Sequence, residues 1–294
     1  RGASRGWLKV QDGCDRRCSF CATRLARGPS RSRSVEQVLQ EAQFLAKAHA
    51  ELVLTGIHIG HYGLDLPTSS SLAELCRVLL DRVPEVRFRL GSVEATEVDN
   101  KLLELIATSG GQLAPHLHMP LQSGANPILR SMRRWHTREQ YRARTLEIAA
   151  RVEPLGLGAD IISGFPGETD ADHRATVDLV LELPFTYLHV FPFSPRDGTP
   201  ASDLRNPVPQ RIAGERAREL RESGIAKGVA HRATRVGCSA RVVLEGEGRV
   251  GLTGDYLRVE IRDESAQPSG IFSGMLAGNA EQLRIDAPLK MGRN

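Results

Sequence analysis

Hydrophobic positions before residue 230 follow two alternating patterns. Short apolar runs, typical of buried strands, are separated by segments in which apolar residues recur every three or four positions, as on one face of a helix. Strands are predicted at 7–11, 51–55, 86–91, 115–120, 157–163 and 186–192. Helices are predicted at 35–49, 71–82, 98–108, 125–133, 137–152 and 170–183, with a longer one at 210–229.

Strands that alternate with helices predict an α/β fold built on a parallel sheet. Six such units are too few for the closed eight-stranded TIM barrel. The expected architecture is therefore an open six-stranded (β/α) partial barrel. One helix start carries its own signal, because Ser34 and Gln37 form a capping-box pattern just before the apolar period of 35–49.

The pattern changes after Arg235. β-like segments at 240–246, 249–261, 270–276 and 281–288 alternate with glycines and predict a small antiparallel β-barrel. A chain of 294 residues is long enough for two domains. We expect a core at 1–229 and the small barrel at 230–294.

Composition adds few constraints. The chain is 40% hydrophobic and 25% charged, as expected of a packed globular protein. No apolar run reaches the length of a membrane span, so no membrane partner is expected. The odd count of five cysteines argues against a disulfide framework and for a reducing, cytoplasmic setting. Cys76 is expected in a buried helix and Cys238 in a strand near the domain junction, neither with an assigned role.

The other three cysteines form a compact motif. Cys14, Cys18 and Cys21 are spaced C-x3-C-x2-C. A closed structural zinc site takes four ligands, whereas a three-cysteine loop suits an iron–sulfur cluster with one iron left open. A zinc site completed by a distant histidine, or simple buried thiols, remain alternatives.

Basic residues gather around this motif. Residues 1–33 hold nine Arg or Lys and two Asp, while the whole chain has a net charge of only +4. Such clustering favours an anionic partner, and phosphate is the first candidate. The alternative is an ordinary solvated surface.

The string from Gln11 to Ser34 resembles the cluster loop of radical S-adenosylmethionine (SAM) enzymes, and within them that of the methylthiotransferases. The resemblance implies a 4Fe–4S cluster on the three cysteines, with SAM chelated at the open iron and cleaved by one electron to a 5′-deoxyadenosyl radical. It also implies an electron donor such as flavodoxin or ferredoxin. Phe20 matches the aromatic position that lies against the adenine in these enzymes.

Four further segments, 53–63, 116–124, 160–169 and 188–201, resemble the branch that methylthiolates C2 of N6-threonylcarbamoyladenosine at tRNA position 37. This implies the tRNA anticodon stem-loop as partner. The isopentenyladenosine branch and the ribosomal-protein branch are alternatives, although the latter usually has a histidine where this chain has Ser123. The segment 251–261 resembles the TRAM domain, an RNA-binding appendage.

The resemblance also implies site residues on the loops that follow the strands. Thr55 and Gly56 lie where the backbone approaches the methionyl amine, and Glu94 and Asp160 could bind ribose hydroxyls or that amine. The predicted cofactor contacts are Phe20, Thr55, Gly56, Glu94, Gln122, Ser123 and Asp160, and the predicted RNA contacts are Arg27, Arg31 and Arg33. His116 and His118 alternate along a strand and should share a face.

The sequence departs from the family in one respect. Family members carry an N-terminal domain in which three more cysteines hold a second 4Fe–4S cluster for sulfur delivery, and residues 1–294 contain no second trio. The chain is therefore expected to be a fragment that is incomplete for the full reaction. A non-enzymatic RNA-binding module with a structural metal is the competing interpretation.

Overall fold

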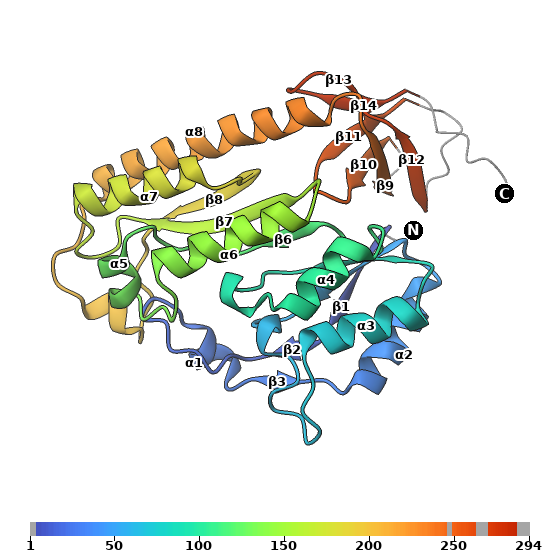
Figure 1. Ribbon diagram of the computed structural model, residues 1–294. Coiled ribbons are helices and arrows are strands. Elements are labelled where there is room, and N and C mark those ends of the chain that lie inside the picture. The colour runs from blue at the N-terminus through green and yellow to red at the C-terminus, as the bar shows by residue number, and fades with distance from the viewer. Residues whose placement is uncertain (1–3, 246–248, 263–269, 287–294) are drawn as a thin grey trace, which may run out of the picture.

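Six parallel strands form the core of the computed structural model, which describes residues 4–245, 249–262 and 270–286 (Figure 1). All six match a predicted strand. They are β1 (Arg5–Lys9), β4 (Glu51–Thr55), β5 (Arg87–Leu90), β6 (His116–His118), β7 (Gly156–Ser163) and β8 (Tyr187–Pro192).

The strands make two parallel triplets, β1-β4-β5 and β6-β7-β8. Single bridges, Phe88 to Leu113 and Ser92 to His118, join β5 to the neighbourhood of β6. β6 is shorter than predicted because regular pairing with β7 covers only residues 116–118. With β1 and β8 as unpaired edges of the core sheet, the predicted open six-stranded partial barrel is confirmed.

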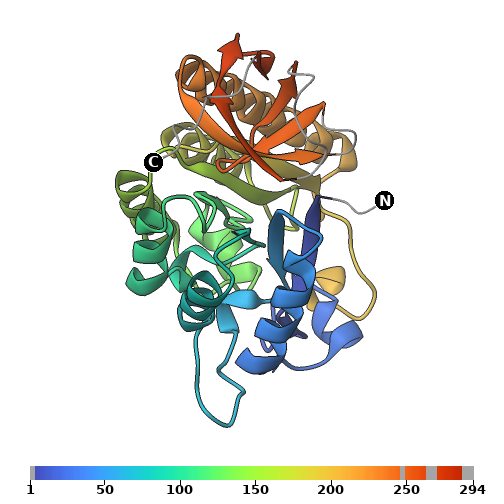
Figure 2. The same ribbon diagram turned by 90° about the vertical axis from the view of Figure 1, so that its right-hand side faces the viewer.

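Helices cover the outer side of this sheet (Figures 1 and 2). They are α2 (Val35–Ala46), α3 (Leu72–Arg82), α4 (Asn100–Thr108), α5 (Asn126–Ser131), α6 (Arg138–Arg151) and α7 (Asp170–Glu182). The capping box of Ser34 and Gln37 is present, and Thr137 and Thr169 begin α6 and α7 in the same way. Each box satisfies backbone N–H groups that a helix start leaves unpaired.

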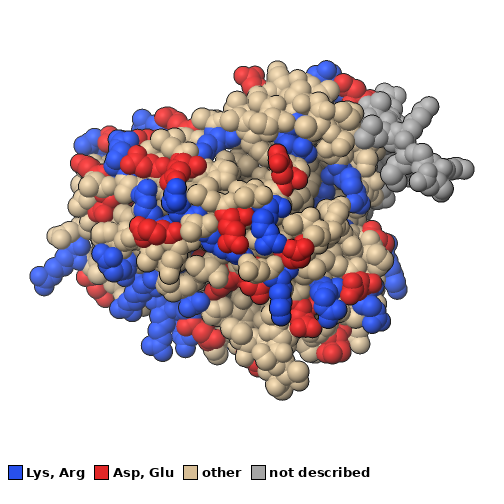
Figure 3. Space-filling model, in the orientation of Figure 1, with Lys and Arg blue, Asp and Glu red and all other residues tan. Residues whose placement is uncertain are grey.

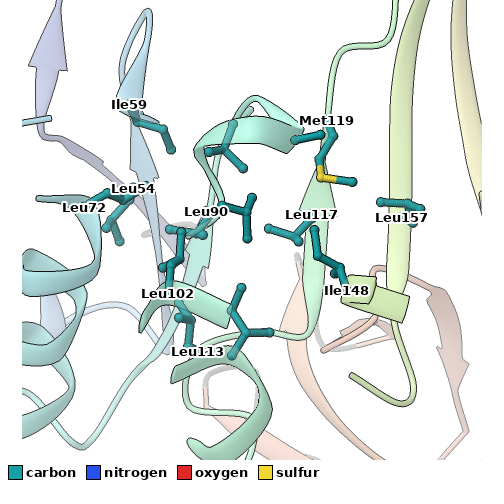
Figure 4. Close-up of a cluster of buried hydrophobic side chains, with 14 of the residues drawn as sticks. Leu54, Ile59, Leu72, Leu90, Leu102, Leu113, Leu117, Met119, Ile148 and Leu157 are labelled. Atoms are coloured by element: carbon teal, nitrogen blue, oxygen red, sulfur yellow. The ribbon is translucent and has the colours of Figure 1, made fainter. Parts of the chain in front are cut away.

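Alternation along each strand separates an apolar face from a polar one. Leu54, Leu90, Leu117 and Leu157 point outward into the hydrophobic core beneath the helices (Figure 4). Their neighbours in sequence face the opposite side, because successive side chains of a strand alternate. The inner side, which we call the lumen, is therefore lined by polar residues: Glu51, Arg87, Arg89, His116, His118 and Asp160.

Short elements at the carboxyl ends of the strands were not predicted. The chain after β1 forms β2 (Gln11–Asp12), α1 (Thr23–Arg27) and β3 (Arg31–Ser32). Three 3-10 turns follow later strands: Ile59–His61, Ala95–Glu97 and Pro200–Asp203. Their brevity explains why periodicity did not reveal them.

The C-terminal part begins with α8 (Gln210–Arg235), which runs six residues beyond the predicted end, so the predicted boundary between 229 and 230 falls inside the helix. The strands that follow are β9 (Ser239–Glu245), β10 (Val250–Thr253), β11 (Arg258–Ile261), β12 (Ile271–Met275), β13 (Ala277–Gly278) and β14 (Leu283–Ile285). The predicted strand residues 246, 287 and 288 lie outside the described part of the chain.

These strands form one curled sheet in the order β12-β9-β10-β11-β14-β13. Its pairing is antiparallel as predicted, except that β11 and β14 run parallel. The two edges, β12 and β13, are joined through Leu276 alone, so the sheet bends back on itself. Its own hydrophobic core includes Val242, Val259 and Ile285.

The turn between β10 and β11 closes the amino-terminal end of the lumen. Arg89 donates to the carbonyls of Thr253 and Gly254, both at 2.8 Å, and Arg87 donates to that of Leu252 at 2.8 Å. The fit is close enough that a Cβ on Gly156 would lie 2.3 Å from the carbonyl oxygen of Asp255. The curled sheet is thus docked opposite the carboxyl ends of the strands (Figure 1).

We predict that Glu51→Gln destabilises the protein by about 3–5 kcal/mol, because it removes the anionic partner of two buried guanidinium groups. Glu51 is fully buried and accepts from Arg89 Nε at 3.0 Å and Arg87 Nε at 2.5 Å. Urea unfolding monitored by circular dichroism measures the change. Glu74→Gln, in an exposed pair with Arg77, is the control and should stay within about 0.5 kcal/mol.

The ion pairs of Glu51 with Arg87 and Arg89 should also make the stability of the protein depend on pH. Burial acts to raise the pKa of Glu51, but the attraction of Arg87 and Arg89 outweighs it and holds the pKa below the ordinary 4.5. The stabilisation is therefore complete above pH 4.5 and is lost as pH falls through the depressed pKa. Equal acid sensitivity of the wild type and Glu51→Gln would contradict this assignment.

Candidate active site

The cysteine loop follows β2 at the carboxyl end of the core sheet. Gly13 has φ of +71°, and a Cβ there would lie 1.9 Å from the carbonyl oxygen of Pro29. The buried side chain of Gln11 donates to the Gly13 carbonyl at 2.7 Å and accepts from the His58 backbone N–H at 2.9 Å. Gln11 thereby ties the cysteine loop to the loop that follows β4.

Two of the sulfurs face polar partners from other loops. Nδ1 of His58 lies 3.5 Å from Sγ of Cys14, and a guanidinium nitrogen of Arg134 lies 3.8 Å from Sγ of Cys18. Burial raises the pKa of both thiols. A bound metal cation would favour the thiolate forms, which are the forms that ligate metals.

Each of these partners is held by a carboxylate. Arg134 makes a short ion pair with Glu94, and Nε2 of His58 lies 2.9 Å from Oε2 of Glu97. Burial acts to raise the pKa of Glu97, but hydrogen bonds from His58, His61 and Arg16 outweigh it and lower that pKa strongly.

The sequence did not predict these carboxylates as partners of the groups that face the sulfurs. Glu94 was predicted to contact the cofactor directly, and the structure shows it engaged with Arg134, so direct contact stays a prediction. Arg16 and Arg134 also pack against the ring of Trp135, at 3.9 and 4.3 Å from its centroid. No periodic pattern marks such partners, because they come from separate loops.

The sulfur spacing allows a test of the predicted metal group. Among the described residues, two sets of three metal-binding side chains converge within 4.8 Å, and neither contains a cysteine. A tetrahedral zinc with bonds of about 2.3 Å would hold its sulfurs about 3.8 Å apart. At least one pair of the three cysteine sulfurs therefore lies more than 4.8 Å apart, which fits a polynuclear iron–sulfur cluster better than a single zinc ion.

The remaining predicted cofactor residues surround the loop. A Cβ on Gly56 would lie 2.8 Å from the Gln11 carbonyl oxygen, so only glycine allows the chain after Thr55 to come this close to Gln11. Phe20 is partly buried against a small apolar cluster that contains Phe165 and is separate from the main core. These positions agree with the prediction without testing cofactor contact.

The loop after β6 holds the next pair. Gln122 has φ of +67°, and its backbone bonds Asp160 and Ile162 of β7. Ser123 is 1% exposed and accepts from the Ala125 N–H at 3.2 Å. Ser123 therefore has a structural role, and its predicted contact with the cofactor stays a prediction.

Asp160 lies within the lumen. Its Oδ1 is 3.0 Å from Nε2 of His118 and 3.3 Å from Nδ1 of His189. Burial acts to raise its pKa, but the hydrogen bond and charge of His118, with a contribution from His189, outweigh it and lower that pKa. The predicted shared face of His116 and His118 is confirmed, since both bond the hydroxyl of Tyr187.

The three arginines predicted to bind RNA differ in their surroundings. The side chains of Arg27 and Arg31 are 56% and 55% exposed, and both lie near Asp12. Arg33 instead pairs with Glu41 and donates to the Lys9 carbonyl at 2.8 Å. In Figure 3, Lys and Arg gather at the lower left of the molecule, where Figure 1 shows α1.

Fold and site together define a radical SAM protein, and the comparison with known families agrees. Residues 8–180 match the family model of the radical SAM superfamily. The chain belongs to that superfamily, which implies a 4Fe–4S cluster and SAM.

Known relatives narrow the class. The chain is 37% identical over 282 residues to the threonylcarbamoyladenosine tRNA methylthiotransferase MtaB of Rickettsia prowazekii, covering 95% of this chain and 66% of that protein. It is 40% identical over 219 residues to MtaB of Bacillus subtilis, covering 74% and 48%. The tRNA-2-methylthio-N(6)-dimethylallyladenosine synthase of Geobacillus kaustophilus is 34% identical over 224 residues, with 76% and 42% covered.

These relatives confirm the predicted resemblance to radical SAM methylthiotransferases. The chain spans only 42% to 66% of their length.

Solved structures support the fold. The radical SAM methyltransferase TsrM of Kitasatospora setae matches with a TM-score of 0.57 at 18% identity, covering 68% of this chain and 39% of that one. Coproporphyrinogen III oxidase (HemN) of Escherichia coli matches with a TM-score of 0.54 at 18% identity, covering 80% and 54%.

Among the described helices, none has both the length and the apolar character needed to cross a bilayer.

We predict that replacing Cys14, Cys18 or Cys21 by alanine abolishes iron binding after anaerobic reconstitution, because a cluster that loses one of three protein ligands is no longer held. Iron content and visible absorbance measure the effect. Cys238→Ala, outside the site, is the control and should keep its iron. Full zinc occupancy without iron in the wild type would contradict the assignment.

Proposed function

We propose that this chain is the catalytic core of a tRNA methylthiotransferase that acts on C2 of N6-threonylcarbamoyladenosine at position 37. The carrying observation is the cysteine loop at the open end of a lumen lined by polar side chains. Two relatives that carry this activity in their names support the substrate, at 37% and 40% identity. The tRNA anticodon stem-loop and an electron donor such as flavodoxin or ferredoxin are the proposed partners.

The chain's own residues hold and shield the cofactors. When bound, the cluster and SAM together supply one-electron cleavage of the sulfonium. Cys14, Cys18 and Cys21 would bind the iron, while the Arg134 guanidinium donates toward Cys18 and offsets negative charge there, and the His58 ring lies against Cys14. Phe20, Thr55, Gly56, Glu94, Gln122 and Ser123 are the proposed contacts to SAM, whereas Asp160, which was predicted with them, is assigned to the substrate below.

The reconstituted 294-residue chain should form 5′-deoxyadenosine from SAM in the presence of dithionite. It should give no methylthiolated RNA, because the second cluster that the family uses for sulfur delivery needs three further cysteines. Chromatography with mass detection measures both products. Cys18→Ala is the control and should form neither, whereas methylthiolated RNA from the wild-type chain alone would contradict the second expectation.

RNA binding should depend on the exposed arginines. Because Arg27 and Arg31 have more than half of their side chains exposed, Arg27→Gln and Arg31→Gln should weaken binding of an anticodon stem-loop. Each should also flatten the slope of log K against log salt by about one unit, through lost phosphate contacts.

Arg77→Gln is the matched control for this series, since Arg77 is equally exposed but lies on α3. Fluorescence anisotropy at several salt concentrations provides the comparison. If Arg77→Gln and Arg27→Gln weaken binding to the same degree, the basic loop has no specific role. Arg33→Gln, at the third proposed RNA contact, should weaken binding less than the other two, since Arg33 is already paired with Glu41.

A further inference from the structure

A cluster of polar side chains crosses the lumen beneath the cysteine loop. It consists of His118 on β6, Asp160 on β7, and Tyr187 and His189 on β8. All four lie on the inner face, because their neighbours along each strand face the hydrophobic core on the outer side. These neighbours are Leu117 on β6, Ala159 and Ile161 on β7, and Leu188 and Val190 on β8. Asp160 stands three residues before the end of β7, which puts the cluster about 10 Å below the rim of the sheet.

The cluster is ordered from the buried interior toward the opening. Nδ1 of His118 lies 3.1 Å from the Tyr187 hydroxyl, and its Nε2 lies 3.0 Å from Oδ1 of Asp160. Gly158 makes room for this arrangement, since a Cβ there would lie 2.0 Å from the Tyr187 ring. The exposed fractions of the side chains rise from 10% for His118 to 27% for Asp160 and 55% for His189.

The fold does not need these polar groups. The backbone at Asp160 is already held by parallel pairing with β8 and by the Gln122 N–H, which donates to its carbonyl at 2.8 Å. Polar side chains in a partly buried lumen cost free energy unless they are hydrogen-bonded. Both histidines lie within hydrogen-bonding distance of Oδ1 of Asp160, whose side chain remains 27% exposed. A partly exposed carboxylate beside two imidazoles is a site for a polar ligand.

Aromatic side chains beside the cluster indicate what kind of ligand enters. Phe191, two residues beyond His189, shares its face and is 53% exposed. Trp7 lies on the lumen face of the other edge strand, opposite to buried Leu8, and is 66% exposed. Exposed aromatic rings at an opening offer stacking surfaces for a nucleobase.

We propose that His118, Asp160 and His189 recognise the N6 substituent of the substrate adenosine, and that they select a polar substituent of ureido and carboxylate chemistry over a hydrocarbon one. This inference rests on the proposed function. Asp160 can accept from an N–H of such a group, and the His189 ring, whose Nδ1 faces Asp160, can donate to one of its oxygens through Nε2, while His118 orients Asp160. A hydrocarbon substituent would exclude water from Asp160 and His189 without offering them a hydrogen bond in exchange, which is the situation that polar sites reject most strongly.

The test compares binding of three anticodon stem-loop RNAs that differ only at adenosine 37, which carries a threonylcarbamoyl group, a dimethylallyl group or no substituent. The protein is the full chain reconstituted with iron–sulfur and SAM. The variants are Asp160→Asn and His189→Phe. Asp178→Asn makes the same charge change on the exposed outer side of α7 and is the matched control.

The wild type and Asp178→Asn should bind the threonylcarbamoyl RNA most tightly. Asp160→Asn and His189→Phe should lose about tenfold in affinity for that RNA, the equivalent of one hydrogen bond. Their affinity for the unsubstituted RNA should change less than twofold, because phosphate contacts are untouched. Circular dichroism confirms that each variant is folded.

Other outcomes overturn the inference. Equal losses for all three RNAs would make the cluster structural, and a wild type that binds all three equally or favours the dimethylallyl RNA would remove the proposed selectivity. A divalent metal bound stoichiometrically by the wild type and lost in Asp160→Asn would make the three residues a metal site. A wild type that binds none of the RNAs, or forms no 5′-deoxyadenosine, would overturn the proposed function and the inference with it.

Discussion

The ion network of Glu51 with Arg87 and Arg89 is the interaction on which the arrangement of the molecule depends. One buried carboxylate holds two guanidinium groups, and these donate to backbone carbonyls of the β10–β11 hairpin. A buried ion pair offsets the cost of its desolvation only when its remaining hydrogen-bonding groups are satisfied. The carbonyls of the hairpin accept from further N–H groups of the two arginines, and the arginines in turn hold the hairpin in place. The hairpin thereby closes the amino-terminal end of the lumen.

Charged side chains are also paired with one another at the open end of the lumen, around the cysteine loop. Two of the cysteine sulfurs are each reached by a chain of contacts that begins at a carboxylate. Glu94 pairs with Arg134, which faces Cys18, and Glu97 pairs with His58, which faces Cys14. The carboxylates fix the orientation of the groups that face the sulfurs. A cluster held here would meet a preformed polar shell, so its surroundings need little rearrangement on binding.

The sequence predicted those parts of the fold that depend on local periodicity and spacing. The six core strands, the capping box at Ser34 and the cysteine motif are of this kind. The parallel pair β11–β14, the closing hairpin and the partners Arg134 and Glu97 join segments distant in sequence, and no local pattern encodes them. Alternation along β6 nevertheless predicted that His116 and His118 share a face, and only their contacts with Tyr187 and Asp160 required the structure.

The two regions expected to bind RNA lie at opposite ends of the core. The basic cysteine loop is at the carboxyl ends of the strands and the curled sheet is at the amino ends (Figure 1). A cavity of about 610 Å³ lies where the edge strands meet the curled sheet, and Arg5, Arg232 and Arg258 are among its lining residues. Because Arg5 belongs to edge strand β1, which leads into the cysteine loop, basic side chains are present at both ends of this strand. We propose that an RNA that contacts both regions runs along the open side of the barrel, between the edge strands β1 and β8. That path brings its bases to the lumen from the side on which Trp7 and Phe191 are exposed.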